Sequence, residues 1–290
     1  KGCGFVPEGD TVWRAARKLD QALSGARLAV CDFRVPQLAT VDLVGADVIN
    51  TVARGKHLLT RLRHEEHGDI SLHTHLKMEG AWQVYAPGAR WRRPVHQARV
   101  LLGTTDHTAV GFSLGIVELV PTAAEGSVVG HLGPDLLGSD WDAEEAVRRL
   151  LAEPQRSIHA ALLDQRNLAG VGNMYAAEVC FLQGVHPQTP VGEIPRLSRL
   201  VGQVQQMLDL NRRRAVQATT GDLRDGQRFW VYRRDRRPCR RCRTLIEVAM
   251  FATDGSTGPA EPEAPEAPGL ATPRQRERAC YWCPHCQPTP

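Results

Sequence analysis

The residues with the clearest chemistry are four cysteines near the end of the chain. They form two Cys-x-x-Cys pairs, Cys239 with Cys242 and Cys283 with Cys286. A tetrahedral Zn²⁺ binds four thiolates, and two such pairs supply them without a large hydrophobic core. The alternatives are two disulfides or four unrelated thiols. The chain shows no secretory signature, and reducing compartments disfavour disulfides, so the pattern favours one structural Zn²⁺.

The remaining cysteines lack this pattern. Cys3, Cys31 and Cys180 stand alone in the sequence. Cys280 precedes Cys283 at the same spacing and is a competing ligand, which we rank below the cysteine of the terminal pair.

Basic and aromatic residues flank both cysteine pairs. Residues 230–234 lead to the first pair and residues 278–282 to the second. Their alternation predicts the two strands of a hairpin with exposed cations. Arginines also gather at residues 212–214 and 233–243, although the net charge of the chain is only +4. Such clusters favour a polyanionic partner, with a solvated basic face as the alternative.

Length and composition bound the architecture. A chain of 290 residues with 42% hydrophobic residues can form two compact domains and a small metal module. No apolar run reaches the roughly 18 residues of a membrane span, and no signal peptide is visible. We therefore expect a soluble, intracellular, cytoplasmic protein. No sequence pattern indicates an oligomerisation surface, so a monomer is expected.

The hydrophobic pattern predicts an α+β protein that is β-rich first and α-rich second. Residues 11–23 have helical spacing, and Ser24 and Gly25 end that helix. Short runs between turns then predict an antiparallel β-sandwich. The predicted strands include residues 28–30, 41–44, 58–62, 81–85 and 98–102. Predicted helices cover residues 141–151, 157–164, 173–182 and 197–210.

A segment between the two cysteine pairs has a different composition. Residues 253–276 are rich in Pro, Glu, Ala, Gly and Thr and hold almost no large apolar side chains. Such a segment cannot offset its ordering entropy, so it is predicted to be disordered. A zinc hairpin tolerates the insertion, because each doubling of a closed loop costs only about 0.6 kcal/mol.

A glycine-bearing turn joins two of the predicted helices. Gly170 and Gly172 permit close approach of the backbone to a partner, and Asn173 is placed at the N-cap of the next helix. Amides at a helix N-terminus are a natural phosphate seat. Glycine turns between helices are more often only turns, so the signal is weak by itself.

Five motifs follow one another along the chain. They are Pro-Glu-Gly-Asp-Thr-Val at 7–12, Gly-Lys-His-Leu-Leu at 55–59, His-Leu-Lys-Met-Glu-Gly at 75–80, the segment 162–178 with its Gly-Val-Gly-Asn turn, and Trp-Cys-Pro-His-Cys-Gln at 282–287. In this order they resemble the family of formamidopyrimidine-DNA glycosylases and endonuclease VIII-like enzymes, nearest to its actinobacterial endonuclease VIII-like branch. The resemblance covers nearly the whole chain from Pro7. It implies a catalytic β-sandwich domain, a helix-two-turn-helix domain and a zinc-finger hairpin.

The resemblance also implies four catalytic residues. Pro7 matches the N-terminal proline whose secondary amine attacks the sugar C1′, and Glu8 matches the general acid on the ring oxygen. Lys56 would lower the pKa of that amine and stabilise leaving phosphate oxygens. Arg278 matches the zinc-finger arginine that holds the phosphate beside the lesion and assists δ-elimination.

Further matching residues are expected to contact the DNA. Met78 would insert as an apolar wedge where the lesion leaves the stack, with a core methionine as the alternative. His96 would contact the backbone near the lesion. Asn173 would bind phosphate together with the amides around Gly170 and Gly172.

The chain departs from this family in three places. Pro7 follows six residues, so its nitrogen is an amide here, and we expect the active protein to begin at Pro7 after loss of residues 1–6. Residues 110–118 lack the Arg-Phe pair that probes the opposite strand, which shifts the expected substrate from 8-oxoguanine to oxidised pyrimidines. His159 replaces a common lysine and leaves one phosphate contact in doubt.

These inferences predict a bifunctional DNA glycosylase and abasic-site lyase of base excision repair, acting on damaged DNA by β,δ-elimination. The alternatives are a non-catalytic damaged-DNA binding protein and an 8-oxoguanine or formamidopyrimidine glycosylase. A generic zinc-ribbon module would not explain Pro7, Glu8 or Lys56. The expected domains are an extension (1–6), the catalytic domain (7–130), the helix-two-turn-helix domain (131–228) and the zinc finger (229–290).

Overall fold

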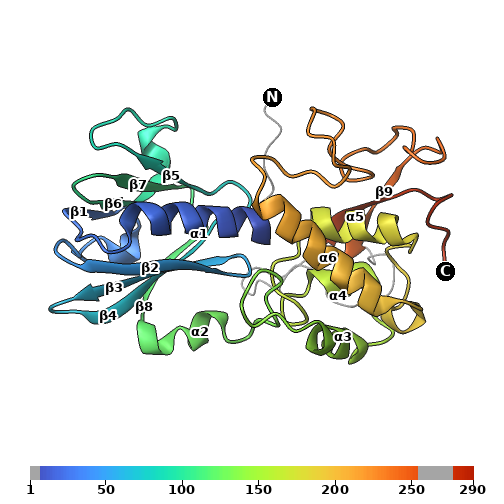
Figure 1. Ribbon diagram of the computed structural model, residues 1–290, viewed down its shortest axis with the longest axis horizontal. Helices are drawn as coiled ribbons and strands as arrows, with labels where there is room; N and C mark the ends of the chain where they lie inside the picture. Colours follow the sequence, from blue (N-terminus) through green and yellow to red (C-terminus); the bar gives the residue numbers. More distant parts are fainter. Residues whose placement is uncertain (1–6, 254–276) are drawn as a thin grey trace, which may run out of the picture. The chain divides into compact units, whose positions relative to one another are not determined.

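The computed structural model describes residues 7–253 and 277–290 (Figure 1). The chain divides into two compact units, Lys1–Trp141 and Asp142–Pro290. The first unit is a helix with two antiparallel sheets, and the second combines helices with a short hairpin. The predicted α+β class is confirmed, including the β-rich first half and the α-rich second half.

Two four-stranded antiparallel sheets form the first unit. One sheet has the order β1 (Val30–Phe33), β6 (Ala98–Gly103), β7 (Thr108–Phe112) and β5 (Ala81–Tyr85). The other has the order β2 (Asp47–Arg54), β3 (His57–His64), β4 (Gly68–His75) and β8 (Ile116–Pro121). A short helix, α2 (Gly126–Val129), follows β8. Single 3-10 turns occupy Pro36–Leu38, Val95–Gln97 and Thr122–Ala124.

Helix α1 (Gly9–Leu23) packs against strands of both sheets. Its buried apolar residues Val12, Ala16, Leu19 and Leu23 recur at helical spacing and join the core between the sheets. Gly25 follows the helix with φ 78°, a left-handed conformation that favours glycine. The predicted helix and its end are therefore confirmed, with a start two residues earlier than the pattern indicated.

One predicted strand is wrong. Residues 41–44 form a turn, in which the Oδ1 atom of Asp42 accepts the N–H of Val44 at 2.9 Å and Gly45 follows with φ 89°. Leu43 is fully buried, so the apolar residue that suggested a strand packs into the core from a turn. The strand predicted at 28–30 begins at Val30.

Four helices dominate the second unit. They are α3 (Ala143–Leu151), α4 (Ile158–Leu163), α5 (Asn173–Gln183) and α6 (Leu197–Arg212), with a 3-10 turn at Val191–Glu193. Asp142 caps α3 and Ser157 caps α4 through side-chain oxygens that accept backbone N–H groups. Gly184, with φ 67°, ends α5. The helix–turn–helix pair α4–α5 confirms the predicted helical domain.

The hairpin of the second unit differs from the one expected. Strand β9 (Glu247–Ala252) follows the first cysteine pair and is antiparallel to β10 (Glu277–Trp282). The prediction was correct for the second strand but wrong for residues 230–234, which form turns. The carboxylate of Glu178 accepts the backbone N–H groups of Trp230, Val231 and Tyr232, each at 2.8 Å, so these donors are not available to a strand.

The prediction of disorder for residues 253–276 falls outside the described residues, apart from Thr253. Within the described part, no helix has both the length and the apolar character that crossing a bilayer requires.

Candidate functional site

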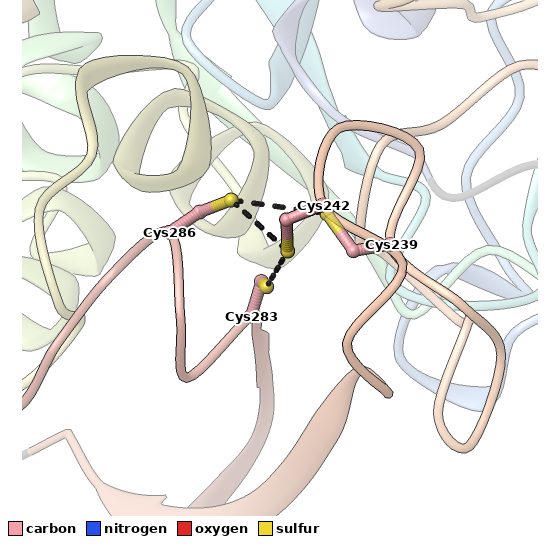
Figure 2. A group of neighbouring side chains, drawn as sticks. All are labelled: Cys239, Cys242, Cys283 and Cys286. Atoms are coloured by element: carbon pink, nitrogen blue, oxygen red, sulfur yellow. Dashed lines mark hydrogen bonds between the residues drawn. The ribbon is translucent and has the colours of Figure 1, made fainter.

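The four cysteines of the two Cys-x-x-Cys pairs converge in the second unit (Figure 2). Their sulfur atoms all lie within 4.8 Å of one another. The Cys242–Cys283, Cys242–Cys286 and Cys239–Cys286 sulfur pairs are separated by 3.4, 3.5 and 3.9 Å. These separations exclude disulfides, whose sulfurs lie about 2.05 Å apart. This cluster could hold a metal ion.

The chemistry of this donor set suits zinc. Four thiolates at about 2.3 Å from a tetrahedral Zn²⁺ would lie about 3.8 Å from one another, close to the observed separations. Cys239 and Cys283 are fully buried, whereas Cys242 and Cys286 are partly exposed. Cys280 does not belong to the group of clustered thiols, so the ranking of Cys286 above it agrees with the geometry.

Two buried side chains hold the cysteine loops. The Oε1 atom of Gln287 accepts the N–H of Cys283 at 3.0 Å, and its Nε2 atom donates to the carbonyl of Val185 at 2.8 Å. Glu178, on α5, receives three backbone N–H groups at residues 230–232 and the hydroxyl of Thr219. Both are completely buried. Burial raises the pKa of Glu178, while these donors act in the opposite direction.

Pro7 and Glu8 lie together at the start of α1. Pro7 is half-buried and Glu8 is 1% exposed. Glu8 occupies the N-cap position, and its carbonyl accepts the N–H groups of Thr11 and Val12 at 2.9 and 3.0 Å. The positive end of the helix dipole favours a carboxylate at this end and disfavours a protonated amine. The residues matched to the nucleophile and the acid therefore share one electrostatic environment.

Lys56 lies in the two-residue turn between β2 and β3, next to a group of histidines. The Nδ1 atom of His57 lies 2.7 Å from Nε2 of His73, whose Nδ1 lies 2.7 Å from the carboxylate of Glu118. The carboxylate can only accept, so Nδ1 of His73 donates to Glu118, and Nε2 of His73 shares a second hydrogen bond with His57. His75 lies edge-on to His57, with ring centroids 4.9 Å apart.

Two of the histidines near Lys56, His57 and His75, are held neutral. Burial, reinforced by the positive neighbours Lys77 and Lys56, lowers the pKa of His75 to about 4. Burial and the surrounding histidines lower the pKa of His57 to about 3. At neutral pH, the imidazoles of His57 and His75 are therefore uncharged.

The two DNA-contact candidates of the first unit lie on the surface. Met78 is 66% exposed in the loop after β4, so the alternative of a core methionine is excluded. Lys77 precedes it with φ 52°, a strained left-handed conformation for a lysine. His96 is exposed in the 3-10 turn Val95–Gln97. Both side chains can reach a partner outside this unit.

The turn between α4 and α5 contains internal hydrogen bonds. Gly170 has φ 108°, and its N–H donates to Oε1 of Gln165 at 3.0 Å. Its role is therefore conformational, since this amide is already occupied. Gly172 is the N-cap of α5 and Asn173 is its first residue, so the expected N-cap was placed one residue late.

Asn173 joins three elements of the second unit. Its Oδ1 atom lies 2.9 Å from Nε2 of His159 on α4, and its Nδ2 atom donates to the carbonyl of Ala279 on β10 at 2.7 Å. Arg278, the preceding residue of β10, is exposed. The structure therefore brings the first residue of α5 beside the strand that carries Arg278.

The sequence pattern did not reveal two of these residues. Glu178 ends the 162–178 motif, but no local pattern indicates that its carboxylate caps residues 230–232. His57 and His75 fall within two of the family motifs, whereas His73 lies outside them. β3 and β4 pair His57 with His75, and His73 lies two residues before His75 on β4.

The connection that carries the family's Arg-Phe pair is short here. β7 ends at Phe112, which is fully buried, and β8 begins at Ile116. Ser113 donates its N–H to the carbonyl of Gln97 at 2.7 Å, and Gly115 donates to the carbonyl of His75 at 2.9 Å. The only phenylalanine of this segment is thus a core residue.

Comparison with known proteins agrees with this geometry. The model of the formamidopyrimidine-DNA glycosylase N-terminal domain matches residues 6–113, and that of the formamidopyrimidine-DNA glycosylase H2TH domain matches residues 132–222. A Streptomyces coelicolor protein named probable endonuclease 8 2 is 51% identical over 288 residues, covering 98% of this chain and 95% of that protein.

A Mycolicibacterium smegmatis protein named DNA-(apurinic or apyrimidinic site) lyase Nei2 is 44% identical over 282 residues, covering 97% of this chain and 99% of that protein. Among solved structures, Lactococcus lactis Fpg in complex with DNA containing an abasic site has a TM-score of 0.72 at 20% identity, covering 97% of this chain and all of that one. The chain therefore belongs to the formamidopyrimidine-DNA glycosylase and endonuclease VIII family.

Proposed function

We propose that this protein is a bifunctional DNA glycosylase and abasic-site lyase of base excision repair, with Pro7 as its nucleophile. The observation that carries the proposal is the position of Pro7 and the buried Glu8 at the N-terminus of a 15-residue helix. The close relatives named endonuclease 8 2 and abasic-site lyase support the same reaction.

The secondary amine of a free Pro7 attacks C1′ of the damaged nucleotide and expels the base. Glu8 donates a proton to the ring oxygen, which opens the sugar and leaves a cationic iminium on the proline nitrogen. An α-amino group titrates near roughly 7.7 to 8.0, and Lys56 and the helix dipole both favour its neutral form. When Pro7 is bonded to Val6, its nitrogen is an amide and cannot form an iminium, so we propose that the active form begins at Pro7.

The iminium makes the protons next to C1′ acidic, so β-elimination breaks the 3′ phosphate ester and δ-elimination breaks the 5′ ester. Lys56 stabilises the departing phosphate oxygens, and Arg278 holds the neighbouring phosphate. Met78 fills the vacated stack, while His96 and Asn173 contact the DNA backbone, and the turn at Gly170 and Gly172 places Asn173.

Cys239, Cys242, Cys283 and Cys286 would hold one Zn²⁺, which would supply structure and no reaction step, because four thiolates would leave no open coordination position. These cysteines would thereby fix the hairpin that carries Arg278.

Oxidised pyrimidines are the proposed substrates. The buried Phe112 and the short connection after it supply no Arg-Phe pair to test the base opposite the lesion. We propose that the protein acts as a monomer on damaged DNA in the bacterial cytoplasm.

Borohydride trapping on abasic DNA tests the nucleophile. The protein comprising residues 1–290 is compared with a version that begins at Pro7. A covalent adduct with the Pro7 version alone supports the proposal. Equal trapping of both identifies another amine, with Lys56 as the first candidate, and binding without trapping by either identifies a non-catalytic damaged-DNA binding protein. Excision of thymine glycol compared with 8-oxoguanine opposite cytosine then tests the substrate class.

A further inference from the structure

The turn that carries Lys56 has an unusual partner for its backbone. Arg54 and His57 pair at the ends of β2 and β3, leaving Gly55 and Lys56 as a two-residue turn. Gly55 has φ 58° and Lys56 does not have a positive φ, as a type II′ hairpin turn requires. In such a turn the flanking pair makes the last ladder bonds, so the N–H of Gly55 has no partner on either strand.

Asp135 supplies that partner. Its Oδ2 atom accepts the N–H of Gly55 at 2.7 Å, and its Oδ1 atom accepts the N–H of Leu137 at 3.0 Å. Asp135 is 3% exposed, and burial raises its pKa, while the hydrogen bonds from Gly55 and Leu137 act in the opposite direction. The carboxylate is thus held by backbone donors on both sides and has little freedom to turn.

Arg54 forms a second link between the β2–β3 turn and residues 133–140. Its Nη1 atom lies 2.7 and 2.6 Å from the two carboxylate oxygens of Asp140, and its Nη2 atom donates to the carbonyl of Gly133 at 3.1 Å. A Cβ atom at Gly138 would lie 2.5 Å from Oδ1 of Asp140 and 2.9 Å from Cβ of Asp135, so only glycine fits between the two acids. Residues 133–140 therefore follow the β2–β3 turn closely on both sides of Gly55.

We propose that Asp135 is a positioning residue for Lys56. The hydrogen bond to Gly55 fixes the peptide plane that immediately precedes Lys56, and the Arg54–Asp140 pair keeps the segment 133–140 in register with that turn. The inference rests on the proposed role of Lys56. Displacement of a catalytic group by about 1 Å can cost on the order of a hundredfold in rate, so a bond to the adjacent residue can control the reaction.

Single-turnover cleavage of abasic DNA by the Pro7-start protein tests the proposal. The variant Asp135→Ala is expected to lose about tenfold to a hundredfold in rate at saturating DNA, while the Kd for the DNA changes little. Asp69→Asn is the matched control, because Asp69 is an exposed acid of the same sheet that pairs with the exposed Arg63. It is expected to keep the full rate.

A double-mutant cycle separates positioning from general stability. In the Lys56→Ala background, Asp135→Ala is expected to have no further effect on the rate, because the residue it positions is absent. An equal loss in both backgrounds would overturn the proposal. Arg54→Ala provides a second route if Asp135→Ala does not fold, and is expected to show the same dependence on Lys56.

Amide hydrogen exchange at Gly55 keeps this test separate from the test of the proposed function. Faster exchange in Asp135→Ala with an unchanged rate would mean that the bond exists but does not position Lys56. Full activity of Lys56→Ala alone would instead remove the proposed role of Lys56, and the inference would fall with it. Faster exchange together with the lost rate supports the inference.

Discussion

The Nε2 atom of His159 lies 2.9 Å from the Oδ1 atom of Asn173. Asn173 donates its Nδ2 to the carbonyl of Ala279, which identifies Oδ1 as the acceptor and Nε2 of His159 as protonated. His159 is completely buried, and its Nδ1 atom has no hydrogen-bond partner among the described residues. His159 thus orients Asn173 and is not a charged phosphate contact.

The neutral state of His159 makes stability depend on pH. Burial lowers the pKa of His159 from 6.5 to about 4, against the opposing hydrogen bond to Asn173. The buried neutral imidazole of His159 therefore makes its full contribution to the free energy of unfolding above pH 6.5. This contribution is lost as the pH falls towards 4, because the unfolded chain takes up the proton first. The whole loss amounts to about 3 kcal/mol.

Urea unfolding of the protein and of His159→Gln between pH 7 and pH 4 measures this contribution. Gln does not titrate, so the variant should lose less stability on acidification. His67→Gln, a change of an exposed histidine in the β3–β4 turn, should follow the unchanged protein. Parallel curves for the protein and His159→Gln would contradict the assignment.

Zinc content distinguishes the cysteine ligands. Cys283→Ser should lower the metal below one Zn²⁺ per chain and abolish tight binding of abasic DNA, because the hairpin carrying Arg278 loses its anchor. Cys280→Ala should retain the metal, since Cys280 lies outside the cluster of thiols. Elemental analysis and native mass spectrometry provide the measurement. Loss of zinc from Cys280→Ala would show that the ligand set is wrong.

Glu178→Gln should destabilise the protein by about 3 kcal/mol, because an amide NH₂ replaces an acceptor that faces backbone N–H groups in a fully buried site. Chemical denaturation measures the change. Glu144→Gln, at an exposed position of α3, should alter stability far less. Similar losses in both variants would mean that the bonds to residues 230–232 contribute little.

Met78→Ala should slow base excision from duplex DNA by on the order of tenfold, since the wedge offsets part of the unstacking energy. Cleavage of an abasic site in single-stranded DNA should change little. Thermal stability should be unaffected because the side chain is 66% exposed. Met250→Ala, an exposed methionine of β9, is the control. An equal effect on single-stranded DNA would exclude the wedge.

Local patterns predicted the elements that depend on local forces. Helix α1, strand β5 and helix α5 follow hydrophobic spacing and turn residues near their ends, so their positions were found to within a few residues. The short spacing within each Cys-x-x-Cys pair is itself a local pattern, so the cluster of four cysteines was also predicted.

The wrong strand at residues 41–44 reflects a local turn at Asp42, whereas the wrong strand at residues 230–234 arises because a distant side chain overrides the local preference. Residues 230–234 have strand-like alternation, yet Glu178, more than fifty residues earlier, binds their N–H groups. The pairing of Asp135 with Gly55 spans eighty residues and leaves no periodic trace in the sequence. Such carboxylate caps depend on tertiary proximity, which a single sequence does not encode in any local pattern.

The carboxylate of Glu178 also implies an order of assembly. Its hydrogen bonds attach the segment before Cys239 to α5 through protein atoms alone. The first cysteine pair can therefore reach its position as the helices pack, before any metal arrives. Zinc would then recruit Cys283 and Cys286 to a half-formed site, so metal loading would complete the hairpin and not initiate the folding of the helical unit.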